Sequence, residues 1–342
     1  MRGDTVMSVT ISDVASQAGV STSTVSKVIN NNPTISAETT ARVNAAIREL
    51  NYIPNSRAVS FAKGQAKNVV YLSTLGKDVA YENPHMFDII CGAEHELNRR
   101  GYHLTLFNLD KDTKKIDQSL KDAMTGKSAD GIILNGAFVT PQVERIMLDH
   151  DFPHICIGKP KFNTILSWID TNHSLSANMA VDHLLNRGCT KLAFMGGQSG
   201  DEIFLDRLNG FETALQRNGM TIPDGFITYN EPDIDVIYAS ALQLLQRSSR
   251  PDGIICTNSL MAAGTIRAIE ALNLVLPDDV ALVAFDDYPF TPLLSPKPTV
   301  IEIDLFSLGV HAVSSLMKKI KDPATLIQTY TALPVLIKRE TS

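Results

Sequence analysis

The stretch VTISDVASQAGVSTSTVSKVIN, residues 9–30, decides the fold of the N-terminal region. Thr10 and Asp13 stand three residues apart, the spacing at which a capping pair satisfies unpaired backbone N–H groups at a helix start. Apolar residues then recur at helical spacing until Gly19, which ends the first helix, and Ser21 is a second N-cap. The pattern therefore predicts two short helices joined by a tight turn.

A third helix is expected from about Ser36 to Leu50, and Pro54 ends the unit. Small Ala15 and apolar Val25 lie where the first two helices cross, so the three helices predict a helix-turn-helix. The second helix has a polar outer face that suits a major groove. The periodicity alone fits a solvated helical hairpin equally well, and both interpretations stay open at this point.

Charge separates this head from the rest of the chain. Residues 1–67 hold seven Lys and Arg against four acidic residues, a net charge of +3. The whole chain carries −6, so the remaining 275 residues carry −9. A basic head on an acidic body suggests that the head meets a polyanion.

Composition places the chain among ordinary globular proteins. Its 342 residues are 44% hydrophobic and 20% charged, which excludes a disordered or collagen-like chain and suits two or three domains. No apolar run reaches membrane-spanning length, and the first residues lack the apolar core of a signal peptide. We therefore expect a cytoplasmic protein with no membrane partner.

The sequence shows no pattern typical of a metal site, a cofactor or a catalytic nucleophile. The four cysteines are widely spaced and are interpreted as free thiols: Cys91, Cys156, Cys189 and Cys256. The eight histidines form no HExxH motif, and no GxSxG elbow is present. The segment 125–128 resembles the end of a P-loop but has Lys121 where the first Gly is required. No metal, no cofactor and no enzymatic activity are expected.

From residue 68 onward, short β-branched runs alternate with amphipathic stretches of helical length. The expected strands are Val69–Ser73, His103–Asn108, Gly131–Asn135, His154–Gly158, Lys191–Met195, Gly253–Cys256 and Val280–Phe285. The expected helices include Phe87–Arg100 and Leu208–Asn218. Continuous apolar strands that alternate with helices predict doubly wound parallel sheets, and their number predicts two similar subdomains.

Residues 9–30 and the segment ELNYIPN, residues 49–55, resemble the lactose/galactose repressor family of bacterial transcription regulators. The resemblance continues to the C-terminus through four landmarks: Asp130–Leu134, Arg207–Phe211, Leu276–Val280 and Phe285–Asp287. It implies an all-α helix-turn-helix head and an α/β periplasmic-binding-protein-like body of two doubly wound lobes, with a ligand held between them.

The resemblance also implies where the domains begin and end. Residues 8–54 form the DNA-binding head, and residues 55–67 form the hinge helix and linker. The chain is expected to cross between the lobes near residues 161, 292 and 323. The N-terminal lobe then comprises 68–161 and 293–323, and the C-terminal lobe 162–292 and 324–342.

Residues of the head take their DNA-binding roles from the same resemblance. Thr22, Ser23 and Lys27 fall where family members contact bases. The positions that hold phosphates are Thr10, Ser21, Ser26 and Asn30. The hinge helix begins at Asn55, and Phe61 stands where an apolar side chain wedges into the minor groove. The alternative for Phe61 is packing on the partner's hinge.

In the body, the resemblance assigns effector binding to residues that would line the cleft. Arg207 and Asp286 fall at the two charged positions that grip ligand hydroxyls or carboxylates. The remaining candidates are polar Asn258, the apolar Phe87 and Met86, and the only tryptophan, Trp168. Lobe packing is the alternative for Trp168, and an inter-helix salt bridge is the alternative for Arg207.

The resemblance implies a ligand-responsive transcriptional regulator, most simply a repressor. It would bind a palindromic operator as a homodimer, and a sugar or phosphosugar would be its effector. The competing hypothesis is a solute-binding protein of the same body fold with no role on DNA. That protein needs export and does not need residues 10–54. A cytoplasmic sugar enzyme is a third hypothesis, but it lacks an identifiable acid/base pair.

Overall fold

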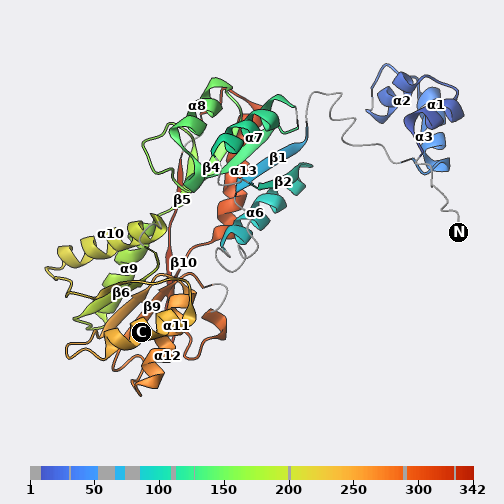
Figure 1. The fold of residues 1–342 in the computed structure, drawn as a ribbon. Coiled ribbons are helices and arrows are strands. Elements are labelled where there is room, and N and C mark those ends of the chain that lie inside the picture. The colour runs from blue at the N-terminus through green and yellow to red at the C-terminus, as the bar shows by residue number, and fades with distance from the viewer. Residues whose placement is uncertain are drawn as a thin grey trace, which may run out of the picture. The chain divides into compact units, whose positions relative to one another are not determined.

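The structure is a computed structural model, and it describes most of the chain. The described residues are 9–30, 32–52, 66–73, 85–108, 113–126, 128–198, 202–287, 291–326 and 329–342. Two compact units are present: a head up to Lys67, with which residues 126–130 are grouped, and a body formed by the rest. Figure 1 labels the elements of both units.

The head contains the three predicted helices. They are α1 (Ile11–Ala18), α2 (Thr22–Ile29) and α3 (Ala37–Glu49), with Thr10, Ser21 and Ser36 as their N-caps. Their apolar faces meet in a small core of Val14, Ala15, Ala18, Val25, Val28, Val43 and Ala46. Both the helix bounds and the inward-facing residues confirm the periodicity of the sequence.

The first lobe of the body is built on a six-stranded parallel sheet in the order β11-β5-β4-β3-β1-β2. Its strands are β1 (Asn68–Ser73), β2 (His103–Asn108), β3 (Gly131–Asn135), β4 (His154–Ile157), β5 (Trp168–Thr171) and β11 (Tyr330–Ala332). Its helices are α6 (His85–Arg99), α7 (Thr113–Thr125), α8 (Pro141–Asp149) and α13 (Leu305–Lys321), and a 3₁₀ turn spans Gly136–Phe138.

The second lobe repeats this plan with the order β12-β10-β9-β8-β6-β7, in which only β12 is antiparallel. Its strands are β6 (Leu192–Gly196), β7 (Ile227–Tyr229), β8 (Gly253–Cys256), β9 (Ala281–Phe285), β10 (Thr299–Glu302) and β12 (Val335–Ile337). Its helices are α9 (His173–Asn186), α10 (Glu202–Arg217), α11 (Ile234–Leu245) and α12 (Ser259–Ala271), and a 3₁₀ turn spans Thr291–Leu293.

The second-lobe sheet is buried on both faces, and each face has its own core. Along β9, Leu282 and Ala284 pack with α11 and α12, whereas Val283 and Phe285 pack with α9 and α10. Successive strand residues point to opposite faces, so an uninterrupted apolar run supplies two cores at once. This burial explains why the central strands were predictable from continuous apolar stretches.

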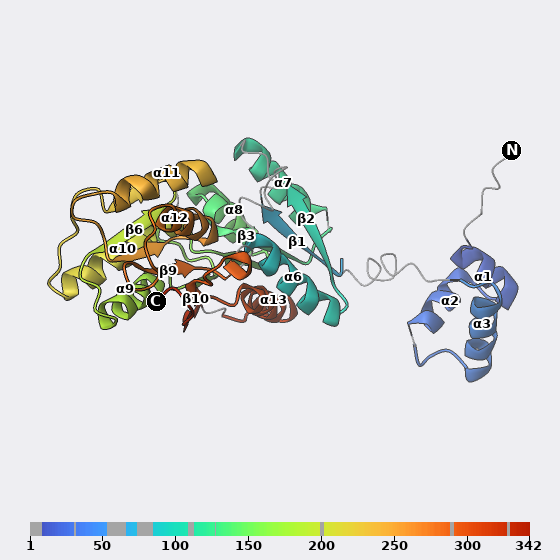
Figure 2. The same ribbon diagram turned by 90° about the horizontal axis from the view of Figure 1, so that it is seen from below.

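In the first lobe, α6 and α13 lie side by side, as both ribbon views show (Figures 1 and 2). The helices approach closely at two glycines. A Cβ on Gly92 would lie 2.0 Å from the Phe306 carbonyl oxygen, and one on Gly309 would lie 2.2 Å from the Ile89 carbonyl oxygen. Glycine is therefore required on each side of this crossing.

The strand pairing places all three crossings between lobes later than the sequence prediction. β5 and β11 pair in the first-lobe sheet, although both were assigned to the C-terminal lobe, and β10 pairs in the second-lobe sheet. The crossings therefore follow β5, β10 and β11, about ten residues after the expected positions 161, 292 and 323. Turn signals such as Gly158 and Pro160 indicated that the chain leaves the first lobe there. They lead instead into β5, the next strand of the same lobe.

The predicted strands and helices of the body are confirmed to within a few residues, except that α10 begins six residues before Leu208. The short strands β5, β7, β10 and β11 were not predicted, because three or four residues carry little periodicity. Within the described ranges, no helix is long and apolar enough to cross a membrane.

Candidate functional site

The start of α1 is closed by a reciprocal cap. The Thr10 hydroxyl oxygen accepts from the Asp13 N–H at 3.4 Å. The Asp13 carboxylate accepts from the Thr10 N–H and from the Thr10 hydroxyl, both at 2.8 Å. These hydrogen bonds, first from the Thr10 backbone and then from its side chain, hold the pKa of Asp13 below its usual value. The Thr10 hydroxyl thus donates to Asp13 within the cap. It can donate to a DNA phosphate only when its hydrogen bond to Asp13 is broken.

The turn between α1 and α2 fixes how α2 is presented. Gly19 adopts a left-handed φ of 64°, and the Val20 N–H donates to the Ala15 carbonyl at 3.0 Å. The Ser21 hydroxyl then accepts from the Thr24 N–H at 3.2 Å and begins α2. Val25 is fully buried beneath this turn. The cap and the core together orient the opposite side of α2 toward solvent.

The three predicted base-contacting residues, Thr22, Ser23 and Lys27, are all exposed on this outer side of α2. They present two hydroxyls and one ammonium, groups that donate to phosphate oxygens and to guanine O6 and N7. We call Thr22, Ser23 and Lys27 the α2 face.

The other predicted DNA-contacting residues are more constrained. Ser26 and Asn30 are half-buried, and the Asn30 amide donates to the Ser26 carbonyl at 2.8 Å, which helps to end α2. The Ser21 hydroxyl is shared with the hydroxyls of Ser23 and Thr24. Asn55 and Phe61, and with them the hinge helix, lie outside the described residues.

In the body, Arg207 of α10 and Asp286, which follows β9, form a buried ion pair at the carboxyl edge of the second-lobe sheet. Nη1 donates to Asp286 Oδ2 at 3.1 Å, and Nη2 donates to Oδ1 and Oδ2 at 3.2 and 3.1 Å. Nη1 also donates to the Thr257 carbonyl at 2.6 Å. The side chains are only 6% and 9% exposed. The structure therefore brings together the two residues predicted to grip the effector.

The surroundings of the pair hold it rigidly. The guanidinium carbon lies 4.4 Å from the centroid of the Phe285 ring. Asp286 adopts a left-handed φ of 67°, which is strained for a non-glycine residue. Burial alone raises the pKa of Asp286, but the charges of Arg207 and His85 outweigh it and lower the pKa. The carboxylate is therefore ionised. In Arg207, Nε is buried and has no hydrogen-bond partner among the described residues.

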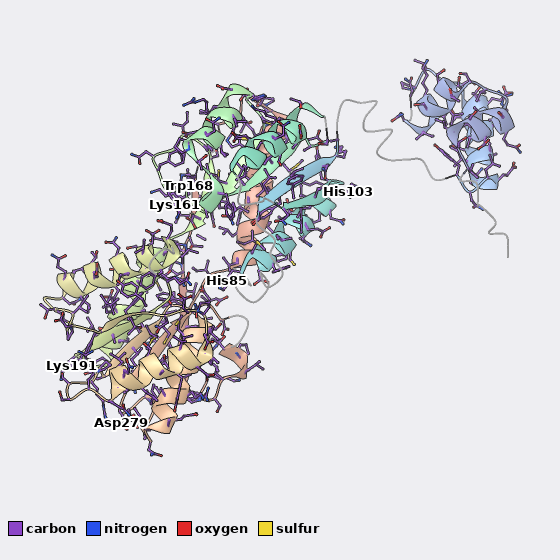
Figure 3. The ribbon with its side chains drawn as sticks, viewed as in Figure 1. His85, His103, Lys161, Trp168, Lys191 and Asp279 are labelled. Carbon is purple, nitrogen blue, oxygen red and sulfur yellow. The ribbon has the colours of Figure 1, made fainter. Side chains whose placement is uncertain are left out.

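His85, the first residue of α6, reaches the same carboxylate from the first lobe. Its Nε2 lies 3.4 Å from Asp286 Oδ2, and Figure 3 labels it at that end of α6. A cavity of about 340 Å³ opens beside this contact. It is lined by His85, Asp88, Asp286, Asp287, Glu302, Ile303, Asp304 and Leu305. We call this space the cleft cavity.

Asp287 connects the cleft cavity to the C-terminal segment. Its carboxylate pairs with both terminal nitrogens of Arg339, and its N–H donates to Glu302 Oε2 at 2.7 Å. The hydrogen bond from Arg339 is the main reason that the pKa of Asp287 is lowered. Burial, followed by the charges of Asp286 and Asp287, raises the pKa of Glu302. Glu302 is the last residue of β10, immediately before a crossing between lobes.

Trp168 lies in β5, before the first crossing, and is labelled in Figure 3. The Lys159 ammonium lies 5.9 Å from the centroid of the Trp168 ring. Asp170, two residues on, accepts from the backbone N–H of Lys159 at 2.7 Å and lies 3.6 Å from His173 Nε2. Trp168 is half-buried and does not line the cleft cavity.

The remaining predicted effector contacts are divided. Phe87 is 40% exposed and shares the first turn of α6 with His85, but Met86 is 3% exposed and packs in the first-lobe core. Asn258 is the N-cap of α12, and its Oδ1 accepts from the Met261 N–H at 2.9 Å. None of these three predicted residues lines the cleft cavity.

Sequence reasoning missed His85, Glu302 and the Asp287–Arg339 pair. The sequence offered a signal close to two of these residues. Asp287 lies inside the family landmark Phe285–Asp287, and His85 directly precedes the predicted effector contact Met86. Their pairing depends on contacts between distant segments, which no local pattern reports. Within the described ranges, no group of three or more His, Cys, Asp or Glu side chains could hold a metal ion.

Two family models match the chain. Residues 10–55 match "Bacterial regulatory proteins, lacI family", and residues 181–342 match "Periplasmic binding protein-like domain". The ribose operon repressor of Escherichia coli K12 is 31% identical over 96% of this chain and 98% of its own length. The chain belongs to the lacI family.

Further relatives agree with this placement. The transcriptional repressor PurR of Histophilus somni strain 2336 is 30% identical over 97% of this lacI-family chain and 98% of its own. A crystal structure of the lac repressor dimer bound to operator and an anti-inducer has a TM-score of 0.83 at 24% identity, covering 98% and 99% of the two chains. The CelR–cellobiose complex has a TM-score of 0.70 at 24% identity, covering 98% and 100%.

Membership confirms the expected fold class, a helix-turn-helix head with a periplasmic-binding-protein-like body. It makes this lacI-family chain a DNA-binding transcriptional regulator and not an enzyme. The match over residues 10–55 favours a regulator over the solute-binding alternative, which does not need that segment.

Proposed function

We propose that this protein is a ligand-controlled transcriptional repressor. Two chains bind a palindromic operator through their heads, and a small effector binds in each body between the lobes. One observation carries the proposal: the same chain joins an exposed α2 face, Thr22, Ser23 and Lys27, to a buried Arg207–Asp286 pair beside the cleft cavity.

The chemistry of the α2 face supports operator binding. Two short hydroxyls and a Lys ammonium project from one side of a helix whose other side is locked in the head core. A helix-turn-helix places such a face in the major groove. Lys27 donates to guanine as a point charge without the planar fork of Arg, so we expect a base preference weaker than an Arg contact gives. A homodimer matches the two-fold symmetry of a palindrome.

The chemistry of the second lobe supports a hydroxyl-bearing effector. A carboxylate and a guanidinium at the carboxyl edge of a parallel sheet provide acceptors and donors where open α/β sheets bind small molecules. One relative is named for the ribose operon, and one structural neighbour is a cellobiose complex. We propose a sugar as the first effector class to test.

Effector and operator must be coupled through the body and the hinge, the segment that lies outside the described residues. In this family, we infer, ligand binding favours one arrangement of the lobes and thereby changes the affinity of the heads for DNA. Such coupling is typically about 1–3 kcal/mol, or about 5- to 150-fold, and it is reciprocal. Operator DNA must therefore change effector affinity by the same factor.

Selection of operator sequences from random duplexes with the full-length protein tests the DNA-binding part. The expected result is an enriched palindrome bound by two chains, with an affinity that falls steeply as salt increases, by a slope of about −0.9 per neutralised phosphate. Enrichment of no sequence would overturn operator recognition. Sedimentation shows whether the free protein is a dimer, and a mass near four chains contradicts that expectation.

The effector part is tested by fluorescence anisotropy on the selected operator, with ribose, glucose, cellobiose and hypoxanthine as probes. Arg207→Lys keeps the charge but loses the bidentate fork, so the effect of an active probe on DNA affinity should disappear. Arg217→Lys, at an exposed position on the same helix, is the matched control and should keep the effect. A probe effect that persists in Arg207→Lys contradicts this site.

A further inference from the structure

The cleft cavity is strongly acidic. Five of the eight lining residues that the structure describes carry carboxylates, and His85 is the only basic residue among those eight. The carboxylates come from both lobes and from the crossing segment between β10 and α13: Asp88, Asp286, Asp287, Glu302 and Asp304. A ligand that enters this space meets an excess of negative charge.

The guanidinium groups that adjoin the cavity are already occupied. Both terminal nitrogens of Arg207 donate to Asp286, and Nη1 also donates to the Thr257 carbonyl, so only the buried Nε has no partner. Both terminal nitrogens of Arg339 donate to Asp287. A ligand that drew Arg207 away from Asp286 would leave a buried carboxylate uncompensated, which is costly.

Three described carboxylates of the cavity form no ion pair with Arg207 or Arg339. Asp304 is the N-cap of α13 and accepts from the Ser307 N–H and hydroxyl at 2.8 and 2.6 Å. Glu302 accepts from the Asp287 N–H, and burial, followed by the charges of Asp286 and Asp287, raises the pKa of Glu302. Asp88 is half-buried on the first turn of α6. A phosphate or carboxylate ligand would face all three.

Lysines on the β4–β5 side of the body are engaged as well. Lys161 pairs with Glu202 at 2.9 Å, and Lys159 lies over Trp168. Asp206, whose pKa is raised mainly by burial and also by the charges of Asp170 and Glu202, adds another acidic group there. This side of the body therefore offers no cluster of unpaired cations among the described residues.

His85 shows what the cavity does accept. Its imidazole Nε2 lies 3.4 Å from Asp286 Oδ2, so a first-lobe side chain adjoins the carboxylate in addition to Arg207. A ligand hydroxyl or amine can donate to Asp286, whereas an ionised phosphate or carboxylate group has no proton to donate and is repelled by the charge. A ligand that binds Asp286 must either displace His85 from this carboxylate or share the carboxylate with it.

We propose that the cleft cavity selects uncharged or cationic effectors, which present a hydroxyl or amine donor to Asp286 in place of His85, and rejects phosphorylated and carboxylated ones. The inference rests on the proposed function, because it assumes that this cavity binds the effector. It narrows the predicted effector class, a sugar or phosphosugar, to uncharged sugars and amino sugars.

The test is isothermal titration of the full-length protein with sets of ligands that share one ring and differ in charge. The sets are glucose, glucosamine and glucose 6-phosphate; ribose and ribose 5-phosphate; and adenosine and its 5′-monophosphate. In any set that binds, the phosphorylated member should bind at least about tenfold more weakly, because like charges about 6 Å apart repel by that much or more at an effective dielectric of about 20. Equal or tighter binding of the phosphorylated member overturns the proposal.

A pair of charge-matched variants locates the cause. Glu302→Gln removes one cavity carboxylate but keeps an acceptor for the Asp287 N–H, so discrimination against phosphate should shrink severalfold. Asp278→Asn changes the net charge equally on an 81% exposed side chain before the start of β9, and should leave discrimination unchanged. Equal effects of both variants would show that net charge, not the cavity, repels the anion, and would overturn the proposal.

Failure of the proposed function gives a different result. If no member of any set binds and none changes operator affinity, the effector role of the cavity fails and the selectivity falls with it. If a phosphorylated ligand binds, releases the operator and loses both effects in Arg207→Lys, the effector site stands and only the charge selectivity is wrong.

Discussion

The α2 face of the head and the Arg207–Asp286 pair of the body present recognition groups in opposite ways. Thr22, Ser23 and Lys27 stand exposed on a helix whose stability comes from the core behind it. Arg207 and Asp286 are buried and hydrogen-bonded to each other. Changes on the α2 face should therefore affect binding alone, whereas changes in the pair should affect binding and folding together.

The largest effect is expected for Arg207→Ala. The substitution leaves the buried Asp286 carboxylate without its main partner, and breaking a buried pair in this way costs about 3–5 kcal/mol. Urea unfolding of the full-length protein, followed by the fluorescence of Trp168 in the body, should show that loss. The exposed Arg217→Ala should change the free energy of unfolding by less than about 0.5 kcal/mol.

Asp286→Ala and the double variant Arg207→Ala/Asp286→Ala complete a thermodynamic cycle. The double variant should lose much less stability than the sum of the two single variants, because removing both charges leaves neither one uncompensated. Strictly additive losses in the free energy of unfolding would show that the two side chains act independently. The contrast between the α2 face and the Arg207–Asp286 pair would then be wrong.

The second effect is expected for Lys27→Ala, and it should separate binding from folding. A single good base contact is worth about 1–3 kcal/mol of discrimination, so operator affinity should fall by that amount while the free energy of unfolding changes by less than about 0.5 kcal/mol. Anisotropy on the selected operator and on a scrambled duplex measures the first quantity. A matched loss on both duplexes would assign Lys27 to phosphate binding instead of base recognition.

The head was predictable because local rules determine it. Thr10, Ser21 and Ser36 cap helices where short oxygen-bearing side chains satisfy the first N–H groups, and Gly19 supplies the left-handed turn. The central strands of the body were predictable from continuous apolar runs. The crossings were placed too early because short strands such as β5 and β10, of four residues each, carry little periodicity.

The cleft was predictable only in part. Arg207 and Asp286 belong to local motifs that the family resemblance carries, and the structure brings them together as expected. His85 was missed because its relation to Asp286 spans two lobes and some two hundred residues, and no periodicity encodes such a contact. Met86 was chosen by its place in the chain, but the phase of α6 turns it into the first-lobe core and leaves Phe87 exposed.

The smallest effect is expected for Asp13→Asn, and it sharpens the comparison within the head itself. Hydrogen bonds from Thr10 lower the pKa of Asp13 below the ordinary 3.8, so the ionised carboxylate stabilises α1. This contribution is present above about pH 4 and is lost as the pH falls through the lowered pKa, because the protonated cap is no longer a strong acceptor. Asparagine cannot titrate, so the variant should lose the contribution at neutral pH and should not change further on acidification.

Amide NMR signals of residues 11–18 in the full-length protein measure this loss, and Glu38→Gln, an acidic residue in the first turn of α3, is the control. The wild type and Glu38→Gln should show fraying of α1 as the pH falls below about 4, while the signals of Asp13→Asn should stay the same from pH 7 to pH 3.

The same titration in the presence of operator tests whether Thr10 also binds DNA. Because its hydroxyl proton is held by Asp13, a real phosphate contact should strengthen once Asp13 no longer competes for that proton. Unchanged operator affinity in Asp13→Asn would leave Thr10 a capping residue and reduce recognition by the head to α2 and the segments that follow it.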